Sequence, residues 1–246
     1  MATKSNLNKR WLYLISGVFT MLFSGVLYAW SILKIPFKNE FQWSDSVLAF
    51  NFTLTMCFFC LGAFFGSLIC KKIGPKITLI LAGILVGVGF VTTGLLSEQI
   101  PYLLYLTYAV LSGTGIGISY NVVVSTVNSW FPDKKGFSSG CLMMGFGIST
   151  LLLGNIISAL FENANVGWSK AYILLGVVVA VVLILAGLVL RKPSADVVFP
   201  APKAKRILKE KALKQEIFQQ KKCLKVLLSG EHLCLWHLSP LLATPL

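Results

Sequence analysis

The sequence predicts an all-α membrane protein with six transmembrane helices. Residues 11–190 consist of six long apolar stretches, with hardly a charged side chain except at their ends. A helix needs about 20 consecutive apolar residues to cross the hydrocarbon core of a bilayer, and each stretch has that length. The chain of 246 residues is 56% hydrophobic, above the about 45–50% of soluble domains, and its mean hydropathy is +0.77. Because lipid offers the backbone no hydrogen-bond partner, each crossing is expected to be helical.

The six predicted spans are joined by short connections that hold most charged residues of this region. The spans cover residues 11–33, 47–70, 77–97, 103–127, 137–161 and 170–190. Pro36 is expected to end the first helix, because the residue before a proline disfavours helical backbone. Short connections require neighbouring helices to run antiparallel. The first apolar run is too long for a cleavable signal peptide, so none is expected.

The net charge of +13 is distributed unevenly between the two ends of the predicted helices. Nineteen of the 22 Lys and Arg residues fall on the side shared by both termini, and the opposite side holds Lys34, Lys38 and Lys170. Positive charge collects in the loops that stay inside the cell. We therefore expect a multi-pass protein of the plasma or cytoplasmic membrane with both termini cytoplasmic. The basic excess reflects topology and attraction to anionic lipid, and no nucleic-acid partner is expected.

The spans contain no constellation that would catalyse a reaction or hold a metal. No Ser/His, His/Asp or paired-carboxylate set lies within them, so the chain is not expected to be an enzyme. Cys57 and Cys60 lie in an apolar helix without a second ligand pair, and free Cys packs there as a small hydrophobe. Cys234 and His237 are two isolated candidates in an unpatterned tail. No metal site and no cofactor are expected.

One basic turn resembles a loop signature of the major facilitator superfamily. Its matching positions are Gly66, Lys71, Lys72, Gly74, Pro75 and Lys76. The usual Asp and Arg of that signature are here Cys70 and Lys71, which leaves the basic turn but removes its carboxylate. An ordinary positive-inside loop is the alternative interpretation of this segment.

Longer segments resemble the oxalate:formate antiporter family within that superfamily. Residues 10–14 and 24–30 are similar to its first span, and residues 115–121 and 128–140 to its fourth span, the following loop and its fifth span. The most specific match is the loop formed by Trp130, Phe131, Pro132, Asp133, Lys134, Lys135 and Gly136. The resemblance covers about residues 9–192.

The resemblance implies the N-terminal half of a twelve-helix fold built from 3+3 repeats, with substrate bound between two six-helix halves. It implies alternating-access exchange or proton-coupled movement of small mono- or dicarboxylates. Its pocket aromatics correspond to Tyr28 and Tyr120, with Trp30 and Asn121 beside them. Tyr hydroxyls can donate to a carboxylate while the rings exclude water. Helix packing or an interfacial position is the alternative for these aromatics.

The family's cationic substrate partners lie in its second half, and the spans here carry no buried charge. A carboxylate without a compensating partner costs several kcal/mol to bury. The sequence therefore predicts a truncated transporter that needs a second six-helix half or a homodimer. The alternative is a six-helix interaction or assembly protein without transport of its own.

The predicted organisation is a six-span unit over residues 1–192 and a basic cytoplasmic linker and tail over residues 193–246. In another reading frame the codons near Lys222 can encode Met-Leu-Lys-Ser-Pro-Ser-Phe-Trp, similar to the opening of the family's second half. Residues 223–246 are thus expected to be out of frame.

Overall fold

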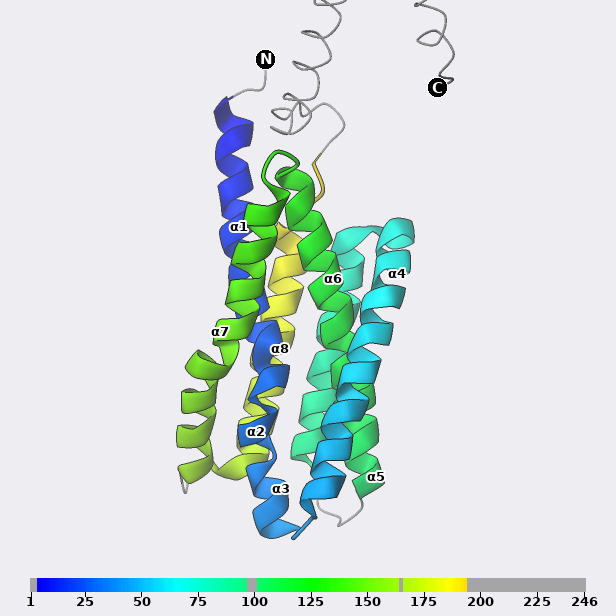
Figure 1. Cartoon of the computed structure of the whole chain (residues 1–246), viewed down its shortest axis with the longest axis vertical. Helices are drawn as coiled ribbons and strands as arrows, with labels where there is room; N and C mark the ends of the chain where they lie inside the picture. The colour runs from blue at the N-terminus through cyan, green and yellow to red at the C-terminus, as the bar shows by residue number, and fades with distance from the viewer. Residues whose placement is uncertain (1–3, 97–100, 164–165, 194–246) are drawn as a thin grey trace, which may run out of the picture. The chain divides into compact units, whose positions relative to one another are not determined.

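The computed structural model describes residues 4–96, 101–163 and 166–193, with side chains from Arg10 onward. These residues are helical almost throughout, and no strand occurs among them (Figure 1). The predicted tail, including Cys223, Cys234, His237 and the proposed frameshift, lies outside the described residues. The elements are α1 Lys4–Ser24, η1 Gly25–Ala29, α2 Trp30–Leu33, α3 Ile35–Glu40, α4 Asp45–Gly94, α5 Pro101–Leu104, η2 Tyr105–Ser112, α6 Gly113–Trp130, α7 Lys135–Glu162 and α8 Gly167–Val189.

The first membrane helix is composite. A 3-10 segment, η1, interrupts it after Ser24, and α2 and α3 then continue to Glu40. The expectation that Pro36 ends this helix is correct only in part: α2 ends at Leu33, as predicted, but Pro36 lies in the first turn of α3, where a backbone N–H has no helical partner to lose, and α3 continues to Glu40. The carbonyl oxygen of Leu33, the last residue of α2, accepts a hydrogen bond from the Tyr172 hydroxyl at 2.6 Å.

The helix α4 turns back on itself at Gly74. Gly74 has φ 82° and ψ 167°, a non-helical conformation that glycine adopts readily and other residues adopt at a cost. Pro75 follows it, and Figure 1 shows the two arms of α4 side by side, joined at this turn. The basic turn predicted between the second and third spans is therefore present, at Gly74 within α4.

Five described helices are long and apolar enough to cross a membrane. They are Arg10–Glu40, Asp45–Gly94, Pro101–Trp130, Lys135–Glu162 and Gly167–Val189. Asp45–Gly94 has 50 residues, or roughly 75 Å of helix, which exceeds twice the about 30 Å of the hydrocarbon core. The chain is a multi-pass membrane protein on this count.

Glycines let the first arm of α4 pack closely against α6. A Cβ on Gly66 would lie 2.8 Å from the Cα of Ile118, and one on Gly113 would lie 2.9 Å from the carbonyl oxygen of Thr55. In lipid, such small residues allow the close backbone contact that drives helix association. Gly66 of the loop signature therefore has a packing role in this structure.

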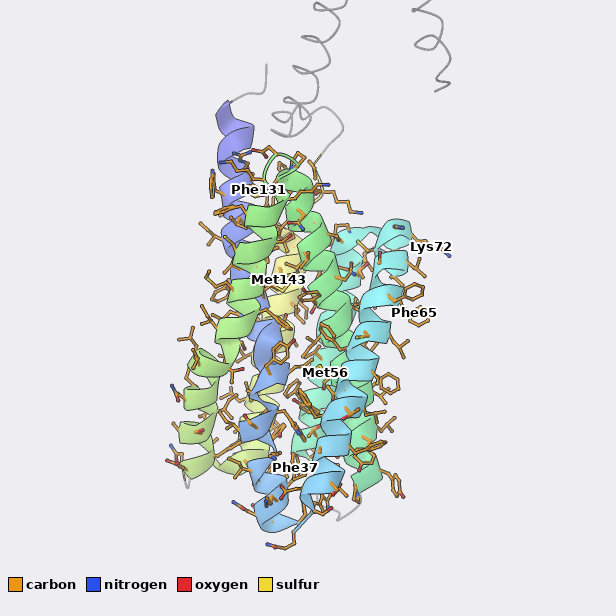
Figure 2. All side chains as sticks on the ribbon, viewed as in Figure 1. Phe37, Met56, Phe65, Lys72, Phe131 and Met143 are labelled. Carbon is orange, nitrogen blue, oxygen red and sulfur yellow. The ribbon has the colours of Figure 1, made fainter. Side chains whose placement is uncertain are left out.

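Aromatic rings fill the end of the bundle that holds α3. The Phe37 ring stacks on Trp43 at a centroid distance of 5.6 Å and contacts Trp168 and Tyr172, both at 5.5 Å. Phe37 is fully buried and lies at the opposite end of the bundle from Phe131 and Lys72 (Figure 2). This packing joins the end of the first membrane helix to the start of α8.

Candidate functional site

The two tyrosines predicted to line a pocket contact the same phenylalanine. Tyr28, on η1, lies edge-on to the Phe146 ring at a centroid distance of 5.3 Å. Tyr120, on α6, contacts the same ring at 5.1 Å. The Tyr28 side chain is 48% exposed, whereas Phe146 is almost fully buried behind it. Residues 92 positions apart are thus brought to one place by a ring from α7.

A fourth ring completes this group, which we call the aromatic cluster: Tyr28, Phe59, Tyr120 and Phe146. Phe59, on the first arm of α4, lies 5.5 Å from Tyr120 and 6.2 Å from Phe146. Sequence reasoning missed Phe59 and Phe146. The sequence did contain a signal for Phe146. It stands between Gly145 and Gly147 in the fifth predicted span, so no neighbouring side chain covers its ring.

Local backbone geometry brings Tyr28 to Phe146. A Cβ on Gly25 would overlap the carbonyl oxygen of Phe146 and lie 2.6 Å from the Cβ of Ser149, so only glycine permits this approach of η1 to α7. The neighbouring Ser24 and Ser119 hydroxyls lie 3.5 Å apart in a buried contact between the first membrane helix and α6. The 3-10 turn is tighter than an α-turn and starts at this contact.

Trp30 lies apart from the aromatic cluster, in the packed interior. Its side chain is 5% exposed, and its ring lies 4.7 Å from that of Tyr108. The indole N–H donates to the carbonyl oxygen of Leu48 at 3.1 Å. These contacts join α2 to α4 and η2.

Asn121 follows Tyr120 on α6 and is half-buried. Its amide makes no hydrogen bond to any described residue. The structure thus brings Tyr28 and Tyr120 together, gives Trp30 contacts elsewhere, and leaves the Asn121 amide available next to Tyr120.

The aromatic cluster can donate hydrogen bonds but offers no cation. Its polar atoms are the two phenol hydroxyls, which can each donate to a carboxylate oxygen. Its remaining surface is aromatic carbon, which excludes water and so strengthens the electrostatic interactions of a bound anion. A carboxylate bound here would need its positive charge from a partner outside these four residues.

The loop at the end of α6, residues 130–136, is anchored by a buried ion pair. A terminal guanidinium nitrogen of Arg10 donates to both carboxylate oxygens of Asp133, at 3.3 and 3.4 Å. The two side chains are only 10% and 11% exposed. The Arg10 guanidinium also lies 5.1 Å from the centroid of the fully buried Phe131 ring, a cation–π contact. Arg10 thus joins α1 to the loop.

Trp130 joins the same loop to the end of α8. Its indole N–H donates to the backbone oxygen of Arg191 at 2.6 Å, and its ring stacks on Tyr13 at 4.6 Å. On the other side, Asn128 exchanges hydrogen bonds with Ser138 and Ser139, at 2.6 and 2.8 Å. The loop therefore joins the ends of α1, α6, α7 and α8. Pro132 is half-buried, and Lys134, Lys135 and Gly136 are exposed.

The turn of α4 presents its charges outward. Lys71, Lys72 and Lys76 are exposed, and Lys72 is visible at the margin of the bundle in Figure 2. Cys70, which occupies the position of the signature's Asp, is 4% exposed and packs inward. Pro75 is half-buried beside the turn residue Gly74.

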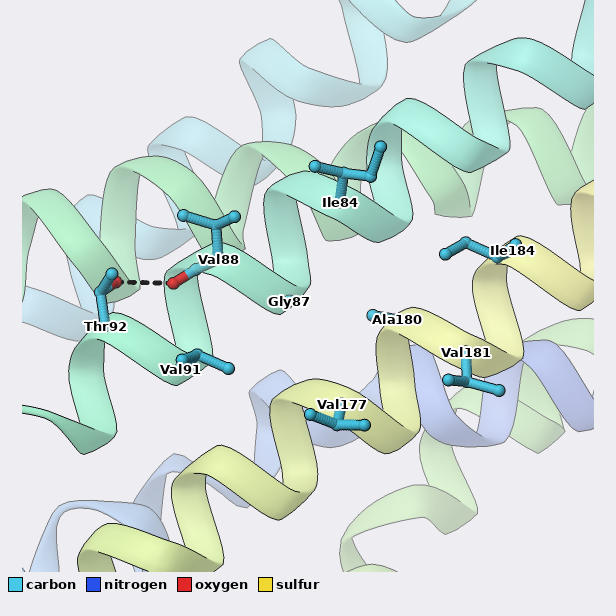
Figure 3. Close-up of a pocket in the computed structure, with 9 residues that line it drawn as sticks. All are labelled: Ile84, Gly87, Val88, Val91, Thr92, Val177, Ala180, Val181 and Ile184. Carbon is cyan, nitrogen blue, oxygen red and sulfur yellow. Dashed lines mark hydrogen bonds between the residues drawn. The ribbon is translucent and has the colours of Figure 1, made fainter.

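An open apolar groove lies between the second arm of α4 and α8 (Figure 3). It has a volume of about 460 Å³, and Val88, Val91, Val177 and Val181 are among its lining residues. Its only hydroxyl side chain, that of Thr92, donates to the carbonyl oxygen of Val88 at 2.6 Å. The groove offers a carboxylate neither a charge nor a free donor, so it is not the candidate site.

The family model and the curated relatives that match this chain all indicate the same superfamily of transporters. The sequence matches the Major Facilitator Superfamily over residues 7–244. It is similar to the oxalate:formate antiporter of Oxalobacter formigenes, with 33% identity over 188 residues, 76% of this chain and 44% of that protein. It is 29% identical to the uncharacterized MFS-type transporter YhjX of Escherichia coli over 191 residues, 77% of this chain and 46% of that protein. Monocarboxylate transporter 12-B of Danio rerio is 31% identical over 165 residues, 66% of this chain and 34% of that protein. The chain spans less than half the length of these relatives.

Proposed function

The chain belongs to the major facilitator superfamily, and we propose that it forms the first six-helix half of a transporter for small carboxylates. It is a transport protein rather than an enzyme, and it resembles the oxalate:formate antiporter. Two of its relatives carry names that specify carboxylate transport, one for oxalate and formate and one for monocarboxylates. Its own substrate class is inferred from these names and from the chemistry of the aromatic cluster.

Six crossings follow if the two arms of α4 are counted separately. Residues 45–73 and 75–94 each reach the about 20 residues that a crossing needs. The non-helical Gly74 and the three exposed lysines around it suit a turn at the membrane surface. With the four other long helices, this gives the half-fold.

The charge of the two ends supports a cytoplasmic location for both termini. At the end with α3, the described side chains Lys34, Lys38 and Lys170 are balanced by carboxylates. At the other end, cations outnumber the one described carboxylate, Asp133. Positive charge favours the cytoplasmic side, so we place that end, and both termini, in the cytoplasm of a cell with the protein in its plasma or cytoplasmic membrane.

The aromatic cluster would form one wall of a substrate site near the middle of the bilayer. The Tyr28 and Tyr120 hydroxyls would donate to a carboxylate, and Asn121 would add an amide donor. Phe146 would hold both tyrosines in place, since its ring contacts both. Trp30 would stabilise the fold without contacting the substrate, by fixing α2 against the carbonyl of Leu48.

Alternating access would move this unit as one body. Arg10 and Trp130 join several helices at one end, and the rings around Phe37 join helices at the other. The cationic partner of the substrate would come from a second six-helix half or from another copy of the chain. The contact of Tyr28 and Tyr120 with a single ring is the observation on which the proposal depends most.

The proposal is tested by reconstituting the full chain in proteoliposomes, alone and with the separately expressed second half of the Oxalobacter formigenes antiporter. We expect labelled oxalate, formate or lactate to exchange only when both are present. Tyr28→Phe and Tyr120→Phe should each raise the KM by about tenfold or more, and the double substitution by about a hundredfold or more, because a lost hydrogen bond to a charged group is worth about 1.5–3 kcal/mol. Trp11→Phe is the control. Trp11 lies at the far end of the first membrane helix from Tyr28, so this substitution should leave the KM unchanged.

Co-purification of the two halves separates failed assembly from failed transport. Assembled halves that exchange none of these carboxylates, or whose exchange ignores both tyrosine substitutions, would contradict the proposal. Stable assembly without exchange would instead favour the second candidate function, a six-helix interaction or assembly protein. The lack of a cation in the aromatic cluster is the observation that favours that candidate.

A further inference from the structure

The two ends of the described bundle differ in how their charges are neutralised. At the end that holds α3, Lys38 lies 2.8 Å and Lys34 3.9 Å from the carboxylate of Asp45. Among the described residues at the opposite end, Asp133 carries the only carboxylate, and it is paired with Arg10. Cations without a described partner therefore concentrate at one end. They are Lys71, Lys72, Lys76, Lys134, Lys135, Arg191 and Lys192.

The turn of α4 has the densest group of these cations. Lys71, Lys72 and Lys76 fall within six consecutive positions, and all three are exposed. Cys70, the residue before them, points inward and carries no carboxylate that could neutralise them. Like charges so close together repel one another, so an anion bound between them would relieve the repulsion.

Apolar side chains alternate with these lysines. Ile73 is 42% exposed and Ile77 is 49% exposed. Both flank Gly74 and Pro75, where α4 turns between its two membrane-crossing arms. A ligand of this surface must therefore combine a negative group for the lysines with hydrocarbon for the isoleucines.

We propose that the α4 turn, residues 71–77, binds the headgroup of an anionic phospholipid. The phosphate lies among the ammonium groups of Lys71, Lys72 and Lys76, and the upper acyl carbons pack against Ile73 and Ile77. A soluble phosphate would satisfy the lysines and leave the isoleucines in water, whereas the phospholipid matches both. The lipid supplies the negative charge that the protein lacks at this turn.

Native mass spectrometry of the purified full-length protein tests this proposal. The protein is equilibrated in micelles that contain equal amounts of phosphatidylglycerol and phosphatidylcholine, and the bound lipids of each class are counted. We expect phosphatidylglycerol to be retained preferentially. A lysine near an anionic surface contributes about a fivefold change in affinity, so Lys71→Gln/Lys72→Gln should lower the preference by about 25-fold.

Lys34→Gln/Lys38→Gln is the matched control, since it removes two lysines whose partner is Asp45. It should leave the preference unchanged. Gel filtration and circular dichroism establish that each variant is folded.

Three results would overturn the proposal. Equal retention of the two lipids would show that the turn has no headgroup site. An equal effect of the control substitution would show that only net charge matters. Competition by inorganic phosphate at the concentration of the lipid, unaffected by Ile73→Ser/Ile77→Ser, would assign the lysines to a soluble anion.

Discussion

The ion pair between Arg10 and Asp133 should stabilise the fold far more than a surface pair does. Both side chains are about nine-tenths buried, and their nearest atoms lie 3.3 Å apart. At an effective dielectric constant of about 20, two charges at that distance attract by about 5 kcal/mol before desolvation is subtracted. Removing one partner of a buried pair typically costs about 3–5 kcal/mol. Because this pair lies at the end of the bundle, we expect Asp133→Asn to lower the free energy of unfolding by about 2 kcal/mol.

A double-mutant cycle with Arg10→Met isolates the pair from the contact of Arg10 with Phe131. Because Arg10→Met also removes this cation–π contact, it should lower the free energy of unfolding by about 0.5–1 kcal/mol more than Asp133→Asn does. Unfolding in mixed micelles at increasing sodium dodecyl sulfate, followed by circular dichroism, measures each variant. Lys38→Gln is the control, since its 2.8 Å pair with Asp45 is shorter but more than half exposed and should contribute little. A coupling energy below about 0.5 kcal/mol between Arg10 and Asp133 would refute the reasoning that burial decides the strength of the pair.

Three further substitutions should report on the fold in the same unfolding assay. Gly113→Ala should destabilise by about 1–3 kcal/mol, because its Cβ would meet backbone 2.9 Å away; Gly147→Ala, with open space at the Cβ, should be neutral, and equal effects would contradict the packing account. Gly74→Ala should cost about 1–3 kcal/mol, since φ 82° with ψ 167° is a backbone region that only glycine adopts without strain. Gly136→Ala, with open space at the Cβ, should not destabilise, and a neutral Gly74→Ala would contradict this account of the turn. Trp30→Phe should lose about 0.5–1.5 kcal/mol with its hydrogen bond and leave the KM for carboxylates unchanged, and a raised KM would return Trp30 to the substrate site.

The positions of the membrane helices were predictable because hydropathy and length determine them. The predicted span of residues 137–161 corresponds to Lys135–Glu162, and that of residues 170–190 to Gly167–Val189. The composite first helix was not predictable in the same way. Proline is compatible with the first turn of a helix, so Pro36 alone could not distinguish an end from a restart.

The candidate site was predictable only in part, because a pocket depends on the direction of each side chain. Residues two positions apart on an α-helix point to nearly opposite sides, which separates Trp30 from Tyr28 even without the 3-10 segment that holds Tyr28. Tyr120 was predicted from resemblance, and its meeting with Tyr28 depends on α7, whose Phe146 had no matching motif. The partnership of Arg10 with Asp133, 123 positions apart, likewise has no local sequence signal.

Substrate protection of a thiol at position 28 tests the central claim most directly. Tyr28→Cys, in a chain whose native cysteines are replaced by serine, is assembled with the second six-helix half in proteoliposomes and labelled with a membrane-impermeant thiosulfonate. If the aromatic cluster lines the carboxylate site, saturating oxalate or formate should slow the labelling by tenfold or more, while a chemically similar sulfate control should not. A labelling rate that the transported carboxylate leaves unchanged would contradict the account.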